Sequence, residues 1–333
     1  MKAVKIIGIG SYAPETVITN EDLSKIVDTS DDWIKSRTGI SKRHIVSGNE
    51  TALSLATKAA KEALEFAGET PESIDLIIVA TSMPDNLYPS CACELQRELG
   101  IKETVAFDVV AACSGLIFAM GVAKQFLKDN TYKKALIVGV DIHSRFLDWE
   151  DRSTCVLFGD GAGAMLLTSD EDLSKDEILA IDLNSDGFRG KELTIPLSGN
   201  NCPIVEANDQ KPSTVYMNGR EIFKFAVTEV PKTIRKALEM ANLTINDMDY
   251  LIPHQANKRI ISAIAEKLGI NEETVISNLE EYGNTSTASI PLAMTEAIEK
   301  GIIKPGHTLV ITGFGAGLTW GAAVIKWNAI DKR

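Results

Sequence analysis

The feature that most constrains the fold of this chain is an internal repeat. Residues 59–78, AAKEALEFAGETPESIDLII, align without a gap to residues 233–252, TIRKALEMANLTINDMDYLI, at an offset of 174 positions. Carried further, the same offset pairs Met120 with Met294 and Cys113 with Thr287. Helix–strand units of similar composition can resemble one another by chance. We favour a duplication, because the register stays ungapped over several predicted elements.

Hydrophobic periodicity indicates what each half contains. Residues 53–67 and 222–241 show the period of helices, whereas LIIVATS (76–82), ALIVGV (135–140) and TLVITG (308–313) are short apolar runs typical of strands. We therefore predict an α/β fold with two halves, 1–170 and 171–333, each a sheet covered by helices. Loops at equivalent strand ends of two such halves can meet, so the partners of a residue in one half are sought in the other.

Composition narrows the class of protein. The chain has 333 residues, of which 44% are hydrophobic and 24% charged, as in ordinary globular proteins. No apolar run reaches the roughly 20 residues that span a membrane. The start, MKAVKIIGIGSYAPE, lacks the features of a signal peptide, so we expect a cytoplasmic protein. The net charge of −12 argues against a general nucleic-acid binder.

Cysteine usage predicts neither a disulfide framework nor a metal site. The count is odd, the chain is large, and no spacing matches a zinc motif. The cysteines are Cys91, Cys93, Cys113, Cys155 and Cys202.

One of them, Cys113, lies in the stretch DVVAACSGLIFAM (108–120), which is typical of a strand end followed by a helix that runs to about Lys128. The partial positive charge at a helix N-terminus lowers the pKa of a nearby thiol. Cys113 is therefore a candidate nucleophile, and a buried packing thiol is the alternative. This segment alone does not decide between them.

The second half supplies two partners for a nucleophilic cysteine. His254 and Asn257 lie in PHQAN (253–257) after a predicted strand, and Asn284 lies in GNTSTAS (283–289), at the position related to the Cys113 loop. A cysteine with a histidine and an asparagine from distant positions is a nucleophilic constellation. The remaining histidines lack this context and are predicted to be surface or structural residues; they are His44, His143 and His307.

Glycine-rich segments suggest a further feature of the site. GFGAGLTWG (313–321) could supply backbone N–H groups to an oxyanion beside Cys113, or form a tight hairpin, or both. FGDGAGAMLL (158–167) lacks the Lys-Ser/Thr of a phosphate loop and GIGSYAP (8–14) lacks the third glycine of a dinucleotide fingerprint. Because neither segment completes its motif, the sequence gives little support for a nucleotide-binding site.

These motifs in order resemble a known family over nearly the whole chain. TSDDWIKSRTGI (29–40), ACSG, DRSTCVLFGDGAGA (151–164), HQAN, YGNTSTASIPLA and GFGAGLTWG resemble β-ketoacyl-acyl-carrier-protein synthase III, the initiating condensing enzyme of dissociated fatty acid synthesis. The resemblance implies the thiolase fold, with two pseudo-duplicated halves in a layered αβαβα core, and a homodimer. It implies that a short acyl-CoA acylates the cysteine and that malonyl-acyl-carrier protein then loses carbon dioxide and condenses. Coenzyme A thioester is a substrate, and no permanently bound cofactor or metal is implied.

The resemblance also implies roles for individual residues. The catalytic set is Cys113, His254 and Asn284, with backbone N–H groups of Cys113 and Ala316 as oxyanion donors and Asn257 in support. The implied coenzyme A site comprises Thr29, Trp33, Arg37 and Arg152. The implied carrier-protein patch comprises Lys224, Lys258, Arg259 and Lys267, with Glu266 as an unfavourable neighbour. Tyr88, donated by a neighbouring subunit, is the implied acyl-pocket residue.

Other enzymes of the same fold are less consistent with the sequence. A degradative thiolase would carry a second catalytic cysteine near its C-terminal glycine loop, and GFGAGLTWG has none. A 3-hydroxy-3-methylglutaryl-CoA synthase, which shares this fold, is a further alternative. A non-catalytic partner subunit would not need an intact Cys, His and Asn. A specialised acyltransferase or condensing enzyme of a secondary-metabolite pathway stays open, as does the choice of acyl primer.

Overall fold

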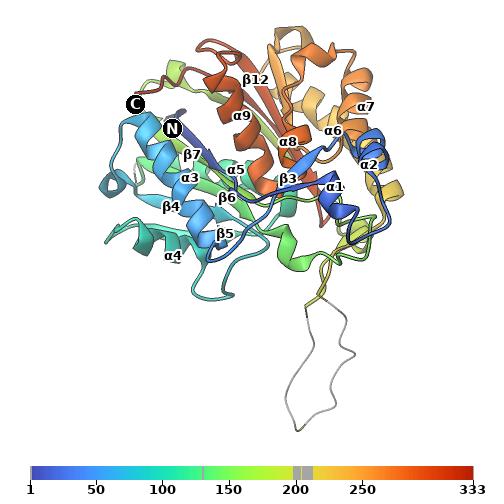
Figure 1. Cartoon of the computed structure of the whole chain (residues 1–333). Coiled ribbons are helices and arrows are strands. Elements are labelled where there is room, and N and C mark those ends of the chain that lie inside the picture. The colour runs from blue at the N-terminus through green and yellow to red at the C-terminus, as the bar shows by residue number, and fades with distance from the viewer. Residues whose placement is uncertain (1, 130, 198–203, 205–212, 333) are drawn as a thin grey trace.

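Two sheets form the frame of the computed structural model, which describes residues 2–129, 131–197, 204 and 213–332 (Figure 1). The first sheet has the strand order β1-β7-β6-β4-β5, and the second has the order β11-β12-β13-β8. The first comprises β1 (Ala3–Tyr12), β4 (Leu76–Ala80), β5 (Val105–Val109), β6 (Lys134–Asp141) and β7 (Gly161–Asp170). The second comprises β8 (Ile178–Ser185), β11 (Tyr250–Pro253), β12 (Thr308–Gly315) and β13 (Thr319–Lys326).

The two sheets repeat the same topology. In the first, β1 and β7 are antiparallel, β7 and β6 are antiparallel, and β6 and β4 are parallel. The series β8, β13, β12 and β11 has the same order and the same directions. The predicted duplication is therefore confirmed, with β5 as an additional edge strand of the first sheet. The division of the chain at residue 170 stays a prediction.

The sheets enclose two central helices and carry further helices on their outer faces. The central helices are α5 (Gly115–Leu127) and α9 (Ser289–Glu299), and their buried side chains join residues of both sheets in one core cluster. The first sheet is covered outside by α3 (Ala52–Ala67) and α4 (Cys91–Glu98), and the second by α6 (Gly219–Met240) and α7 (Lys258–Leu268). A helix that is apolar on most sides must be buried, which explains why α5 and α9 lie in the centre.

Close packing of α9 on the first sheet depends on glycine. A Cβ atom on Gly163 of β7 would lie 2.1 Å from Cγ of Pro291 in α9. A Cβ atom on Gly139 of β6 would lie 2.8 Å from the carbonyl oxygen of Thr287, in the turn that precedes α9. The absence of side chains at these two positions lets that turn approach the strands of the first half, and so places it beside the turn that precedes α5.

Smaller elements cover the ends of the strands where the two halves meet. They form a separate cluster of buried apolar residues that includes Leu23, Ile34, Leu157 and Ile261. These elements are α1 (Asn20–Leu23), α2 (Asp31–Thr38), α8 (Leu279–Tyr282), the strand pair β2 (Val17–Thr19) and β3 (Lys42–His44), and the pair β9 (Leu193–Thr194) and β10 (Tyr216–Met217). Across the residues that the structure describes, none of the helices has the length and apolarity that a membrane crossing requires.

Candidate active site

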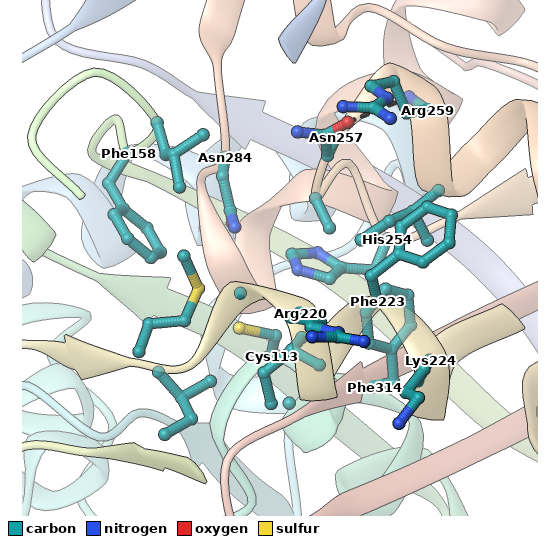
Figure 2. Close-up of a pocket in the computed structure, with 18 of the residues that line it drawn as sticks. Cys113, Phe158, Arg220, Phe223, Lys224, His254, Asn257, Arg259, Asn284 and Phe314 are labelled. Atoms are coloured by element: carbon teal, nitrogen blue, oxygen red, sulfur yellow. Dashed lines mark hydrogen bonds between the residues drawn. The ribbon is translucent and has the colours of Figure 1, made fainter. Parts of the chain in front are cut away.

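A pocket of about 520 Å³ lies where the two halves meet (Figure 2). The first half contributes Arg37, Cys113, Leu157 and Phe158 to its lining. The second half contributes residues of α6 and α7, of the segment that follows β11, of the turn before α9, and of the end of β12. Cys113, His254 and Asn284, which are far apart in sequence, all line this one pocket.

Cys113 lies on a sharp turn, Ala112–Ser114, immediately before α5. Ala112 has a φ of 43°, a left-handed conformation that residues with a side chain rarely adopt. Ser286, which follows Ala112 by 174 positions, has a φ of 52° and begins the equivalent turn before α9. The pairing of Cys113 with Thr287 predicted from the repeat is therefore confirmed by the backbone.

Burial is the main influence on the pKa of the Cys113 thiol. Its side chain is only 7% exposed. Loss of hydration raises the pKa of the thiol to about 12, and the nearby carboxylate of Asp141 adds to the rise. The hydroxyl of Ser286, which donates to Sγ at 3.2 Å, opposes it. The lowered pKa expected from the helix N-terminus is therefore wrong: burial is the largest effect on this thiol, and it raises the pKa.

His254 is a neutral imidazole at the end of β11. It is 1% exposed, and burial lowers its pKa to about 3, with a smaller contribution from His143. Nδ1 lies 2.8 Å from Oγ of Ser289, which leaves Nε2 as the ring nitrogen available to the pocket. The ring of Phe314 packs edge-on against the imidazole with centroids 5.4 Å apart. These contacts hold the ring in one orientation.

Asn284 is fixed by backbone and side-chain hydrogen bonds. Its N–H donates to the carbonyl of Leu157 at 2.9 Å, and its carbonyl accepts from the N–H of Gly159 at 3.0 Å. The side-chain Oδ1 accepts from the N–H of Ser286 at 3.0 Å, so the amide nitrogen is the atom that faces the pocket (Figure 2). The pocket thus presents a thiol, an imidazole nitrogen and an amide N–H₂, and within the described residues no Lys or Arg side chain is bonded to the sulfur.

The glycine-rich segment and Asn257 take structural positions beside the pocket. β12 and β13 form the antiparallel hairpin that was one interpretation of GFGAGLTWG. A Cβ atom on Gly315 would lie 2.8 Å from the backbone nitrogen of Cys113, so the hairpin passes very close to this cysteine. Ala316 follows it, and its N–H remains a predicted oxyanion donor. The side chain of Asn257 caps α7, accepting from the N–H of Arg259 at 2.9 Å, and donates to the carbonyl of Arg37 at 3.2 Å.

The residues implied for coenzyme A form a cluster around Trp33. The guanidinium carbons of Arg37 and Arg152 lie 4.5 Å and 5.0 Å from the centre of the indole ring. Arg37 also lines the pocket, whereas Arg152 donates to the backbone carbonyl of Asp28 at 2.7 Å. Oγ1 of Thr29 is buried and has no hydrogen-bond partner within the described part of the chain.

Only two of the four basic residues implied to bind the carrier protein lie at the pocket. Lys224 and Arg259 are exposed and line the pocket, with Lys224 also paired to Glu221 at 3.1 Å. Lys258 instead pairs with Glu272 at 3.1 Å. Lys267 lies at the other end of α7, beside the exposed Glu266, and is not among the lining residues.

Tyr88, the residue implied for the acyl pocket of a neighbouring subunit, lies outside the pocket of its own chain. Tyr88 is 88% exposed and does not line the pocket. Cys91, Cys93, Cys113 and Cys155 are free thiols, and Cys202 lies outside the described residues. The described residues hold no cluster of three His, Cys, Asp or Glu side chains suited to a metal ion.

Sequence reasoning missed several residues of the site. Arg220 precedes Lys224 by one helical turn on α6 and also lines the pocket, a spacing that could have revealed it. Ser286 and Ser289 contact the sulfur and the imidazole, and both lie within the GNTSTAS segment that was singled out for Asn284. No sequence pattern could have revealed Phe314 as a site residue, because only the geometry of the β12–β13 hairpin brings its ring to His254.

Comparison with known sequence families gives two matches. The family described as 3-oxoacyl-[acyl-carrier-protein] synthase III matches residues 107–187, and the family of its C-terminal part matches residues 238–327. Proteins named beta-ketoacyl-[acyl-carrier-protein] synthase III are similar over the whole chain. The protein from Microcystis aeruginosa is 48% identical over 331 residues, covering 98% of each chain. That from Clostridium acetobutylicum is 50% identical over 328 residues, covering 98% of this chain and 100% of the relative.

Solved structures have the same fold. The 3-oxoacyl-[acyl-carrier-protein] synthase III of Aquifex aeolicus superimposes with a TM-score of 0.89 at 47% identity, covering 98% of this chain and 100% of the other. The enzyme of Pseudomonas aeruginosa gives a TM-score of 0.90 at 39% identity, covering 98% and 99%. The priming beta-ketosynthase of the R1128 polyketide biosynthetic pathway gives 0.91 at 32% identity, covering 99% and 97%.

Proposed function

Because the chain belongs to the β-ketoacyl-acyl-carrier-protein synthase III family, we propose that its own pocket residues carry both halves of the family's reaction on Cys113. The protein is an acyltransferase with the thiolase-like fold that initiates fatty acid synthesis by condensing an acyl-CoA with malonyl-acyl-carrier protein. One observation supports the assignment of roles above all others: Cys113, His254 and Asn284 converge from both halves on one pocket.

The first half-reaction transfers the acyl group to Cys113. The neutral imidazole of His254 accepts the thiol proton on Nε2, and the sulfur bonds to the thioester carbon. Negative charge on the carbonyl oxygen is held by the backbone N–H groups of Cys113 and Ala316. The bond from carbon to the sulfur of coenzyme A breaks, and coenzyme A leaves with the proton. The product is an acyl thioester on Cys113.

The second half-reaction decarboxylates the malonyl group. The bond to the carboxylate breaks, carbon dioxide leaves, and the electron pair moves onto the thioester oxygen. Asn284 Nδ2 donates to that oxygen, and His254 donates as well once Nε2 carries the ring proton. That tautomer requires the Ser289 hydroxyl to turn its proton from the carbonyl of Ser286 to Nδ1 of the ring. In a buried site one such neutral donor contributes about 3–4 kcal/mol to lowering the barrier.

Condensation completes the cycle. The malonyl-derived carbanion attacks the carbonyl of the acyl group on Cys113. The bond between that carbon and the sulfur breaks, 3-oxoacyl-carrier protein leaves, and the thiolate of Cys113 takes up a proton. A thiol suits both steps, because sulfur is a good nucleophile and a good leaving group.

Substrate binding uses the pocket mouth. We place the adenine and phosphates of coenzyme A on the cluster of Trp33, Arg37 and Arg152, with Thr29 beside it. The acidic carrier protein docks on Lys224 and Arg259, which are exposed at the pocket. Lys258 and Lys267 contribute less, because one is paired with Glu272 and the other lies beyond the pocket.

The open edge of the first sheet supports a homodimer. Among the described residues, β5 pairs only with β4, and Val105 and Val110 are 38% and 76% exposed. Pairing this edge with its copy would cover these side chains and remove an edge that would otherwise be free to aggregate. In such a dimer Tyr88 of one subunit would reach the acyl pocket of the other. The cytoplasmic location expected from the sequence also stays a prediction.

Intact-mass measurement after incubation with acyl-CoAs of varied length and branching tests the first half-reaction. We expect a stable acyl adduct that is lost in Cys113→Ala and kept in Cys91→Ala, which removes a buried thiol outside the pocket. If no CoA thioester acylates the protein, the proposal fails at its first step. The length and branching that react best define the primer.

Priming of a polyketide pathway is the second candidate function. It is favoured by the similarity to the R1128 priming ketosynthase, at 32% identity. The same acylation series discriminates the two, provided that the acylated protein is then offered malonyl groups on a fatty acid carrier protein and on a polyketide carrier protein. Faster condensation with the polyketide carrier would favour this alternative.

A further inference from the structure

Three polar groups of Ser286 are each directed at a different functional residue. Its N–H donates to Oδ1 of Asn284 at 3.0 Å, and its hydroxyl donates to Sγ of Cys113 at 3.2 Å. Its carbonyl accepts from Oγ of Ser289 at 2.7 Å, and that oxygen lies 2.8 Å from Nδ1 of His254. Ser286 is 2% exposed, so these bonds are shielded from water. One residue therefore connects the whole candidate site.

We propose that the hydroxyl of Ser286 is a catalytic group that stabilises the thiolate of Cys113, and that its backbone positions Asn284 and His254. The inference deepens the proposed function and rests on it for the identity of the acyl donor. The hydroxyl acts on the reacting sulfur itself, whereas the N–H and carbonyl act through other side chains. The two roles are therefore separable by a substitution that removes only the hydroxyl.

The groups around the sulfur of Cys113 leave its thiolate to be stabilised by neutral hydrogen-bond donors. Within the described chain, no lysine or arginine side chain is bonded to Cys113, and the one charged group that acts on the thiol is the carboxylate of Asp141, which disfavours the thiolate. Burial lowers the pKa of His254, so its imidazole is uncharged and supplies no positive charge to the sulfur. The thiolate must therefore be held by dipoles: the start of α5, the backbone of Cys113 and the Ser286 hydroxyl.

The internal repeat shows that an alanine fits this backbone. Ser286 and Ala112 occupy equivalent turns, with φ values of 52° and 43°, in a region that most side chains avoid. The position in the first half carries only a methyl group, whereas the one in the second half carries a hydroxyl that reaches across to the nucleophile. Ser286→Ala should therefore keep the turn, with its N–H and carbonyl, and lose the hydroxyl alone.

The test measures alkylation of Cys113 by iodoacetamide at pH 8, followed by mass spectrometry of the peptide that contains it. In Ser286→Ala we expect alkylation about 3- to 10-fold slower than in the wild type. Loss of a hydrogen bond to a charged group raises a thiol pKa by about one to two units, and the higher nucleophilicity of the more basic thiolate recovers about half of the effect. Ser286→Gly, which suits a positive φ without strain, should react as slowly as Ser286→Ala.

Ser114→Ala is the matched control. Ser114 is fully buried and adjacent to Cys113, but its hydroxyl donates to the carbonyl of Ala111 at 2.8 Å and not to the sulfur. We expect its alkylation rate to stay within about twofold of the wild type, since the thiolate keeps all its donors. An equal slowing in Ser114→Ala and Ser286→Ala would overturn the proposal, as would a wild-type rate in Ser286→Ala.

A second readout separates the hydroxyl from a purely structural role. Because Ser286→Ala keeps the N–H that orients Asn284, decarboxylation of malonyl-acyl-carrier protein should fall less than acylation by acyl-CoA. An equal loss in both half-reactions would mean that the turn has been disturbed, and would refute the role of the hydroxyl. Failure of the wild type to react with any acyl-CoA would instead contradict the proposed function, because the alkylation assay does not use that substrate.

Discussion

The substitution Asn284→Ala tests whether different groups of the site serve the two half-reactions. Asn284 is 7% exposed, and its Oδ1 is already occupied by the N–H of Ser286, so the amide N–H₂ is the group free to act in the pocket. Removing one buried oxyanion donor costs about 3–4 kcal/mol of transition-state stabilisation. We therefore expect decarboxylation of malonyl-acyl-carrier protein to fall by about 10²- to 10³-fold. Acylation of Cys113 should fall far less, because in the proposed mechanism backbone N–H groups hold the oxyanion of that step.

Two measurements on the same protein decide this prediction. Release of labelled carbon dioxide from malonyl-acyl-carrier protein reports decarboxylation, and intact mass after a pulse of acyl-CoA reports acylation. Asn278→Ala is the matched control, because Asn278 is 8% exposed and donates from Nδ2 to Glu296 at 2.9 Å, outside the pocket. An equal fall of both activities in Asn284→Ala, or unchanged decarboxylation, would refute the assigned role. A similar fall in Asn278→Ala would show that lost stability and not lost chemistry is being measured.

Further expected outcomes concern the rest of the pocket. In Gly315→Ala the new methyl would lie 2.8 Å from the backbone nitrogen of Cys113 and displace the nucleophile, so acylation followed by intact mass should fall by about a hundredfold; a wild-type rate would contradict the close approach. In Trp33→Ala, calorimetry should show coenzyme A binding weakened about tenfold, and an unchanged Kd would rule out the stacking site. Reversing charge in Lys224→Glu with Arg259→Glu should raise the KM for carrier protein more at low salt than at high salt, and a salt-independent change would argue against docking there. Because the pKa of the Cys113 thiol is raised to about 12, its alkylation should increase by nearly tenfold per pH unit from about pH 7 to 9, with the thiolate fraction; a plateau in that range would contradict the burial argument.

Local patterns determined the elements well. The helix expected to run from the Cys113 segment to about Lys128 is α5, which ends at Leu127, and the predicted strand 135–140 is β6, Lys134–Asp141. Each of these depends on periodicity within one segment, which is visible in the chain itself. The repeat added long-range information, because it related the turn of Cys113 to the turn that holds Asn284 before any contact was known.

Other properties of the site arise from contacts between distant segments. The capping of α7 by Asn257 and the pairing of Arg152 with Asp28 depend on which groups meet in space. Ser286 is a further case: it lies in the GNTSTAS segment, but only the folded structure shows its three hydrogen bonds, to Asn284, Cys113 and Ser289.

The sequence by itself indicated a duplicated α/β protein with a candidate nucleophilic cysteine, and with a histidine and an asparagine in loops of the other half, because periodicity, repeat register and motif order are properties of the chain. Only the tertiary structure decided the charge state of that site. The helix N-terminus seen in the sequence favours a thiolate on Cys113, but packing between the two halves removes water from the sulfur and the imidazole alike. Desolvation depends on everything that surrounds a group, and that is set by the fold and not by the neighbouring residues of the chain.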